Sequence, residues 1–136
     1  MGLYVSHDCW DGAYSAFTYW RNKVAETAGY MVAKVGDLGG VPSVLVDWGH
    51  VTQAQLMGEW DETPADPLLV LIAHSDCDGV IHPAQAAPLA DRLDELRPLL
   101  PDEEVPGHVR HWHGATQRFI DGLRRAVAAG EDVEFS

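Results

Sequence analysis

The stretch LLVLIAHSDCDG, residues 68–79, joins the longest apolar run of the chain to a polar turn. The run from Leu68 to Ala73 is continuously apolar, which is typical of a central strand covered on both faces. The polar residues from His74 to Gly79 would then lie at the carboxyl end of that strand. We therefore expect this stretch to define the centre of the fold and the position of its site.

A second stretch near the N-terminus has the same form. A short β-type run, residues 3–6 (LYVS), is followed at once by His7, Asp8 and Cys9. If the two strands are parallel and adjacent, their carboxyl ends open into one crevice, where open α/β sheets bind their ligands. The sequence thus predicts that the turns near residues 7 and 76 meet in a single pocket.

Amphipathic helices are predicted between the strands. Apolar residues recur at helical spacing over residues 13–28, over a segment that begins at Pro83 and ends before Pro98, and from about His108 to Ala129. One helical turn is expected around residues 53–57, and short strands over residues 30–35, 43–46 and 133–135. The pattern predicts an α/β fold, residues 1–136 forming a single compact domain with a short central sheet and about three helices.

Composition excludes several classes of protein. The chain has 136 residues, 46% of them hydrophobic, which is ordinary for a globular domain. Nine Lys and Arg against 21 Asp and Glu leave a formal charge of −12, which argues against a protein that coats nucleic acid. The longest apolar run is too short to cross a bilayer, so no membrane association is expected. The N-terminus has no signal-like pattern and two cysteines provide no disulfide framework, which favours a cytoplasmic location.

The predicted pocket contains possible metal ligands. Histidine and carboxylate donors suit Zn, Mn or Fe, and added thiolates favour Zn. The candidate ligands of a divalent metal, Zn or Mn, are His7, Asp8, Cys9, His74, Asp76 and Asp78. The alternative is that these groups cap strand ends and helix N-termini, as Asp and Ser often do.

Two functions are compatible with these residues. The first is a metal-dependent hydrolase of a small phosphorylated compound or nucleotide, in which the ion activates water and His108 or His111 donates a proton. The second is a non-catalytic binding protein (an immunity protein, an inhibitor or a small-molecule sponge), whose acidic residues 59–66 attract a basic protein partner. Trp48 and Trp60 can line a ligand pocket in either case. A purely structural Zn site is a third possibility, and the oligomeric state is left open.

The turn at residues 74–79 resembles the first motif of DHH-type phosphoesterases, a strand that ends in His-x-Asp-x-Asp-Gly. The matching residues are His74, Asp76, Asp78 and Gly79. The resemblance implies that these His and Asp side chains bind Mn, which activates water against a phosphodiester. The same acids also resemble part of a Ca-binding EF-hand loop, in which oxygen ligands alternate before a glycine.

Over nearly its full length the chain resembles a set of small bacterial and phage-encoded proteins. They share Gly-Leu-x-Val-Ser-His-Asp-Cys-Trp, His-Ser-Asp-Cys-Asp-Gly and Val-Glu-Phe elements, which lie here at residues 2–10, 74–79 and 133–135. The resemblance implies one intact domain and brings no activity with it.

Overall fold

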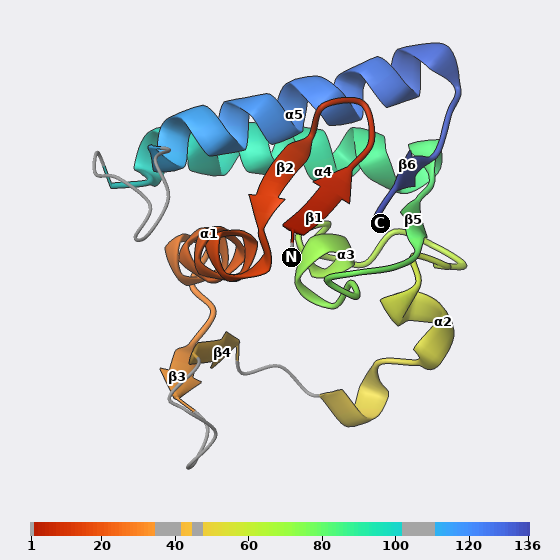
Figure 1. Cartoon of the computed structure of the whole chain (residues 1–136). Coiled ribbons are helices and arrows are strands. Elements are labelled where there is room, and N and C mark those ends of the chain that lie inside the picture. The colour runs from red at the N-terminus through yellow and green to blue at the C-terminus, as the bar shows by residue number, and fades with distance from the viewer. Residues whose placement is uncertain (1, 35–41, 45–47, 102–110) are drawn as a thin grey trace.

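Three long helices dominate the computed structural model, which describes residues 2–34, 42–44, 48–101 and 111–136. Helices α4 (Pro83–Leu96) and α5 (Trp112–Ala129) run antiparallel along one side of the molecule, and α1 (Tyr14–Thr27) is seen end-on beneath them (Figure 1). All three coincide with segments whose apolar spacing predicts a helix. Pro83 occupies the first position of α4, and α5 ends at Gly130 in the left-handed conformation, with φ +66°.

Helix α1 buries its apolar stripe against α5. Phe17, Trp20 and Val24 are fully buried on this face. The Trp20 ring centroid lies 4.9 Å from that of Phe119, and its indole nitrogen donates a 2.9 Å hydrogen bond to the Thr116 hydroxyl. Helix α1 therefore packs on α5 through aromatic rings, and the buried indole N–H of Trp20 has a hydrogen-bond partner there.

The two ends of the chain are joined by short antiparallel strands. β1 (Gly2–Val5) pairs with β2 (Trp10–Ala13), and β5 (Val80–Ile81) pairs with β6 (Val133–Glu134). The residues after β6 connect the two pairs, because Phe135 bridges Val5 and because Tyr4 and Ser136 exchange backbone hydrogen bonds of 3.0 and 2.9 Å. The strands thus follow the spatial order β2, β1, β6, β5.

The described elements between residues 32 and 56 are short and lie below α1 in Figure 1. β3 (Val32–Lys34) pairs with β4 (Pro42–Val44) in an antiparallel register. The predicted helical turn is present as α2 (Gln53–Leu56). It begins with a capping box between Thr52 and Gln55. Two 3₁₀ turns complete the description, η1 (Trp48–His50) and η2 (Arg97–Leu99).

The central strand predicted from Leu68 to Ala73 is wrong. These residues form a buried helical turn, α3 (Leu69–Ile72), with helical hydrogen bonds from Ile72 to Leu68 and from Ala73 to Leu69. The Asp66 carboxylate starts the turn by accepting a 3.0 Å bond from the Leu68 amide. A continuously apolar run has no period, so it fits a buried helix as well as a buried strand.

The chain nevertheless has the mixed α/β architecture that its sequence predicts. Its sheets are small, antiparallel and two-stranded, and the helices supply most of the core. None of the described helices combines the length and the apolar character that crossing a membrane requires.

Candidate functional site

His7 and Asp8 form the tip of the β1–β2 hairpin, and α5 holds this tip. Both residues have left-handed backbones, with φ of +61° and +62°, which is unusual for residues other than glycine. Arg125 donates to the His7 carbonyl at 2.6 and 3.2 Å, and Arg118 donates to the Asp8 carbonyl at 2.9 Å. Arg118 also forms an ion pair with the Asp8 carboxylate. The two arginines therefore fix the turn in its strained conformation.

The other polar groups of this turn are also engaged. The His7 ring contacts the Ser6 hydroxyl at 2.8 Å through Nδ1 and the Glu131 carboxylate at 3.1 Å through Nε2. Cys9 is fully buried, and this burial raises the pKa of its thiol to about 12. The thiolate is the form that attacks substrates and binds metals, and burial of Cys9 disfavours that form.

His74 begins the polar turn at residues 74–79, called the second motif below, and its side chain lies inside the protein. Only 3% of the residue is exposed, and its ring stacks on Phe135 with centroids 4.1 Å apart. Its Nδ1 lies 2.7 Å from the Ser75 carbonyl and its Nε2 lies 2.8 Å from the Val80 carbonyl. Burial is the main cause that lowers the pKa of His74, although both carbonyl contacts oppose it. Both ring nitrogens are thus directed at backbone carbonyls.

Asp76 and Asp78 lie on the exposed loop that His74 closes. The Asp78 carboxylate accepts a 2.8 Å hydrogen bond from the Gly79 amide, and the Ser75 hydroxyl accepts one of 3.3 Å from the Cys77 amide. Arg21 supports the loop from below by donating to the His74 carbonyl at 2.7 Å. Ser75 and Asp78 therefore form hydrogen bonds that stabilise this turn.

The C-terminal strand joins two polar turns in one structural unit. These are the first motif, residues 6–9, and the second motif, residues 74–79. The Ser6 amide donates to the Glu134 carbonyl at 2.9 Å, and the Phe135 amide donates to the Gly79 carbonyl at 3.0 Å. The first motif thus borders one side of residues 134–135 and the second borders the other. The parallel arrangement predicted for them is wrong, because β1 pairs with β2 in antiparallel fashion and the second motif follows a helix.

The predicted ligands do not form a common metal shell in the described residues. No three His, Cys, Asp or Glu side chains of residues 2–34, 42–44, 48–101 and 111–136 are arranged to hold one ion. Of the two predicted proton donors, His108 lies outside the described residues. His111 is exposed at the start of α5, and the helical rise places it about 20 Å along the axis from Arg125, which holds the His7 turn.

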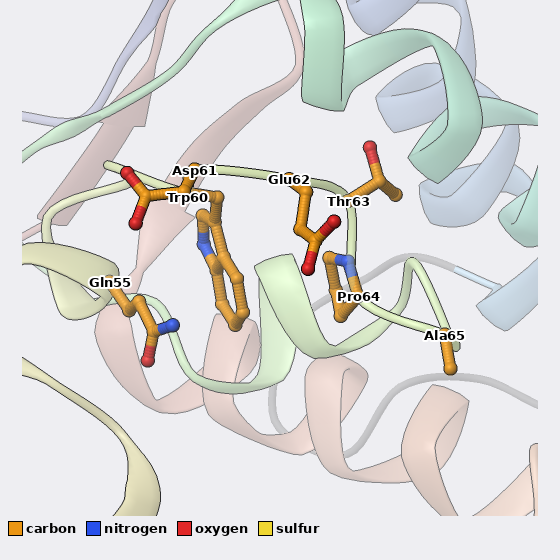
Figure 2. A pocket seen from close by; sticks show the side chains of 7 residues that line it. All are labelled: Gln55, Trp60, Asp61, Glu62, Thr63, Pro64 and Ala65. Atoms are coloured by element: carbon orange, nitrogen blue, oxygen red, sulfur yellow. The ribbon is translucent and has the colours of Figure 1, made fainter.

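A second candidate site lies in the acidic segment that follows α2. A cavity of about 310 Å³ is lined by residues of this segment and of α2. Figure 2 shows the Trp60 ring between Gln55 and Glu62. Neither Asp61 nor Glu62 has an ion-pair partner in the part of the chain that the structure describes. The lining residues are Gln55, Trp60, Asp61, Glu62, Thr63, Pro64 and Ala65.

The acidic segment is held at both ends and in the middle. At one end, Glu59 contacts His82 at 2.8 Å, and in the middle Thr63 donates a 2.9 Å bond to the buried Gln85. At the other end, Asp66 accepts bonds from Tyr30 at 2.9 Å and from Arg92 at 3.1 Å. These anchors leave the carboxylates of Asp61 and Glu62 and the half-buried Trp60 at the cavity.

The sequence identified this segment by its acidic composition and identified Trp60 as a possible pocket residue. Its anchors could not be found in the same way, because His82 directly precedes α4 and Gln85 and Arg92 lie on it, more than 20 positions further along the chain. The side chain of Trp48, the other tryptophan predicted to line a pocket, lies outside the described residues.

Comparisons with known proteins add no assignment to either site. No protein-family model matches the chain. No curated protein and no solved structure matches it either. The resemblances to DHH-type phosphoesterases and to the small bacterial and phage-encoded proteins therefore stay predictions.

Proposed function

We propose that this protein binds a basic protein partner and that an arginine side chain of the partner enters the cavity beside Trp60. The observation that carries the proposal is the pairing of an aromatic face with two carboxylates, Asp61 and Glu62, that have no ion-pair partner among the described residues. The function corresponds to the immunity-protein or inhibitor class predicted from the sequence. A reducing cytoplasm is the proposed location, in keeping with two free cysteines.

The chemistry of the cavity favours a guanidinium group. An arginine can stack its planar group on the indole of Trp60, and cation–π contacts of this kind are strongest with tryptophan. The same group can form two parallel hydrogen bonds with a carboxylate such as Glu62. The formal charge of −12 supports fast encounters with a basic surface, because opposite potentials steer association.

The proposal predicts that the double substitution Asp61→Asn with Glu62→Gln weakens binding of a hexa-arginine peptide. We expect the dissociation constant to rise about tenfold, equivalent to about 1.4 kcal/mol, because the paired carboxylates are lost. Isothermal titration calorimetry at fixed ionic strength measures the change.

A matched control separates the site from the total charge. Glu26→Gln with Asp121→Asn also removes two exposed carboxylates, on α1 and α5, each of which contacts a neighbour on its own helix. We expect a change of less than about twofold for this variant, since screened charges at a distance contribute little. Equal weakening in both variants would show that binding depends on net charge alone.

The metal-dependent hydrolase, with a phosphorylated ligand and Zn or Mn, stays a prediction. It requires that protein purified without a His tag contains stoichiometric metal. The metal should be lost in the His74→Ala and Asp76→Ala variants. Elemental analysis, followed by a nucleotide-hydrolysis screen with Mn, Zn and Mg, measures this directly. Metal-free protein that still binds the hexa-arginine peptide would contradict the hydrolase and leave the binding function in place.

A further inference from the structure

His82 lies between two carboxylates from distant parts of the chain. It is the residue before α4, and its Nδ1 is 2.8 Å from an Asp132 oxygen while its Nε2 is 2.8 Å from a Glu59 oxygen. An ionised carboxylate accepts hydrogen bonds and donates none, so both contacts require both ring nitrogens to carry a proton. The geometry is therefore that of an imidazolium.

The contact joins three segments, one of which forms the wall of the cavity. Glu59 directly precedes Trp60, His82 begins α4, and Asp132 lies between α5 and β6. Among the described charged groups, Glu59 and Asp132 are those that act on the His82 ring. The amino end of α4 has the opposite effect, because the positive end of a helix disfavours a cation.

The hydrogen bond with Glu59 is the largest cause that raises the pKa of His82 above its ordinary value, and the bond with Asp132 is the next. A histidine whose pKa is raised in the folded protein contributes its full stabilisation below the ordinary pKa of about 6.5. That contribution is lost as the pH rises through the folded value. The neutral ring can donate only one bond, and its lone pair then faces a carboxylate.

We propose that His82, Glu59 and Asp132 form a pH-dependent latch that fixes the cavity wall at Trp60 and releases it when His82 loses its proton. This inference rests on the proposed function, since it concerns the same cavity. With the latch closed, the wall is already ordered when the partner arrives. We expect affinity for the hexa-arginine peptide to fall about threefold above the titration, the cost of ordering one or two side chains on binding.

The indole N–H of Trp60 reports the state of the latch in the free protein. We assign its peak in an ¹H–¹⁵N spectrum by its loss in Trp60→Phe. We then follow it together with the His82 ring resonances from about pH 5.5 to about pH 9, a range that begins below the ordinary pKa of histidine and extends well above it, because the pKa of His82 is raised. The latch predicts one shared midpoint for Trp60 and His82. His82→Gln should remove the Trp60 transition, and the control His50→Gln, which removes a histidine outside the latch, should preserve it.

Two further outcomes decide between the latch and the function on which it rests. His82→Arg keeps a permanent cation, so its Trp60 peak should stay at the low-pH position throughout the range. The latch is overturned if the Trp60 peak does not share the midpoint of His82, or if the same Trp60 transition persists in His82→Gln. If the latch titrates as described but no hexa-arginine binding occurs at any pH, the latch stands and the proposed function is overturned.

Discussion

Replacement of Gly58 by alanine is expected to lower the free energy of unfolding by about 3 kcal/mol or more. The loss is large because the substitution causes both backbone strain and overpacking. Gly58 has φ +93°, and a Cβ atom added there would lie 1.6 Å from the Val80 carbonyl oxygen. The backbone approaches this closely because the end of α2 is hydrogen-bonded to the second motif, Val80 to Met57 at 3.1 Å and Ser75 to Leu56 at 2.8 Å. Urea denaturation followed by circular dichroism measures the loss.

Gly29→Ala is the matched control for this substitution. Gly29 also has a left-handed backbone, with φ +99°, but no atom lies within 4 Å of its added Cβ. We therefore expect only the cost of the backbone conformation, about 1 kcal/mol. A similar loss in both variants would mean that α2 does not approach β5 as closely as the structure shows.

The substitution Gly122→Ala is expected to cost about 2 to 3 kcal/mol, by overpacking, although alanine is the better helix former. Gly122 lies in α5 beneath the His7–Asp8 turn, where an added Cβ would be 2.4 Å from the Cys9 sulfur and 2.9 Å from the His7 carbonyl oxygen. The turn would have to move away from Arg118 and Arg125, which hold it. Thermal and urea unfolding measure the effect.

A second glycine of the same helix supplies the control. Gly114 has no atom within 4 Å of an added Cβ, so Gly114→Ala should stabilise the protein by up to about 1 kcal/mol through helix propensity. Adding Cys9→Ala to Gly122→Ala should recover part of the loss, since it removes the nearest atom. Stabilisation by both glycine substitutions would contradict the packing of the turn on α5.

The long helices could be predicted because their apolar residues recur with the helical period. The stripe that includes Phe17, Trp20 and Val24 and the cap at Gly130 are local features, and both occur where the sequence places them. The run from Leu68 to Ala73 has no such period. Its helical turn begins at Asp66, and all of its residues except Leu69 are buried.

The arrangement of the motifs could not be predicted because it depends on pairing between the ends of the chain. Val5 bridges Phe135, and the same strand contacts Gly79 on its other side. Both polar turns were visible in the sequence, but the elements before them do not pair as predicted: β1 pairs with β2 in antiparallel fashion, and residues 69–72 are helical. Long-range antiparallel pairs leave no local signal beyond a short β-type run.

For the acidic segment, the sequence indicated the residues that line the cavity but not the contacts that position them. Its composition and Trp60 were visible in the sequence, whereas the anchors that shape it come from α4 and from the residues before β6. His82 directly precedes the helix that was predicted to begin at Pro83. Its second role depends on Glu59 and Asp132, which are 23 and 50 positions away.

Binding of a basic partner at the acidic cavity is tested most directly by mapping where such a ligand contacts the protein. Hexa-arginine peptide titrated into ¹⁵N-labelled protein should shift the Trp60 indole peak and the amide peaks of residues 60–63 and 65 before any others. If the peptide instead shifts the acidic residues of α4 near Asp91 and Asp94 and leaves residues 60–65 unchanged, the cavity is not the binding site.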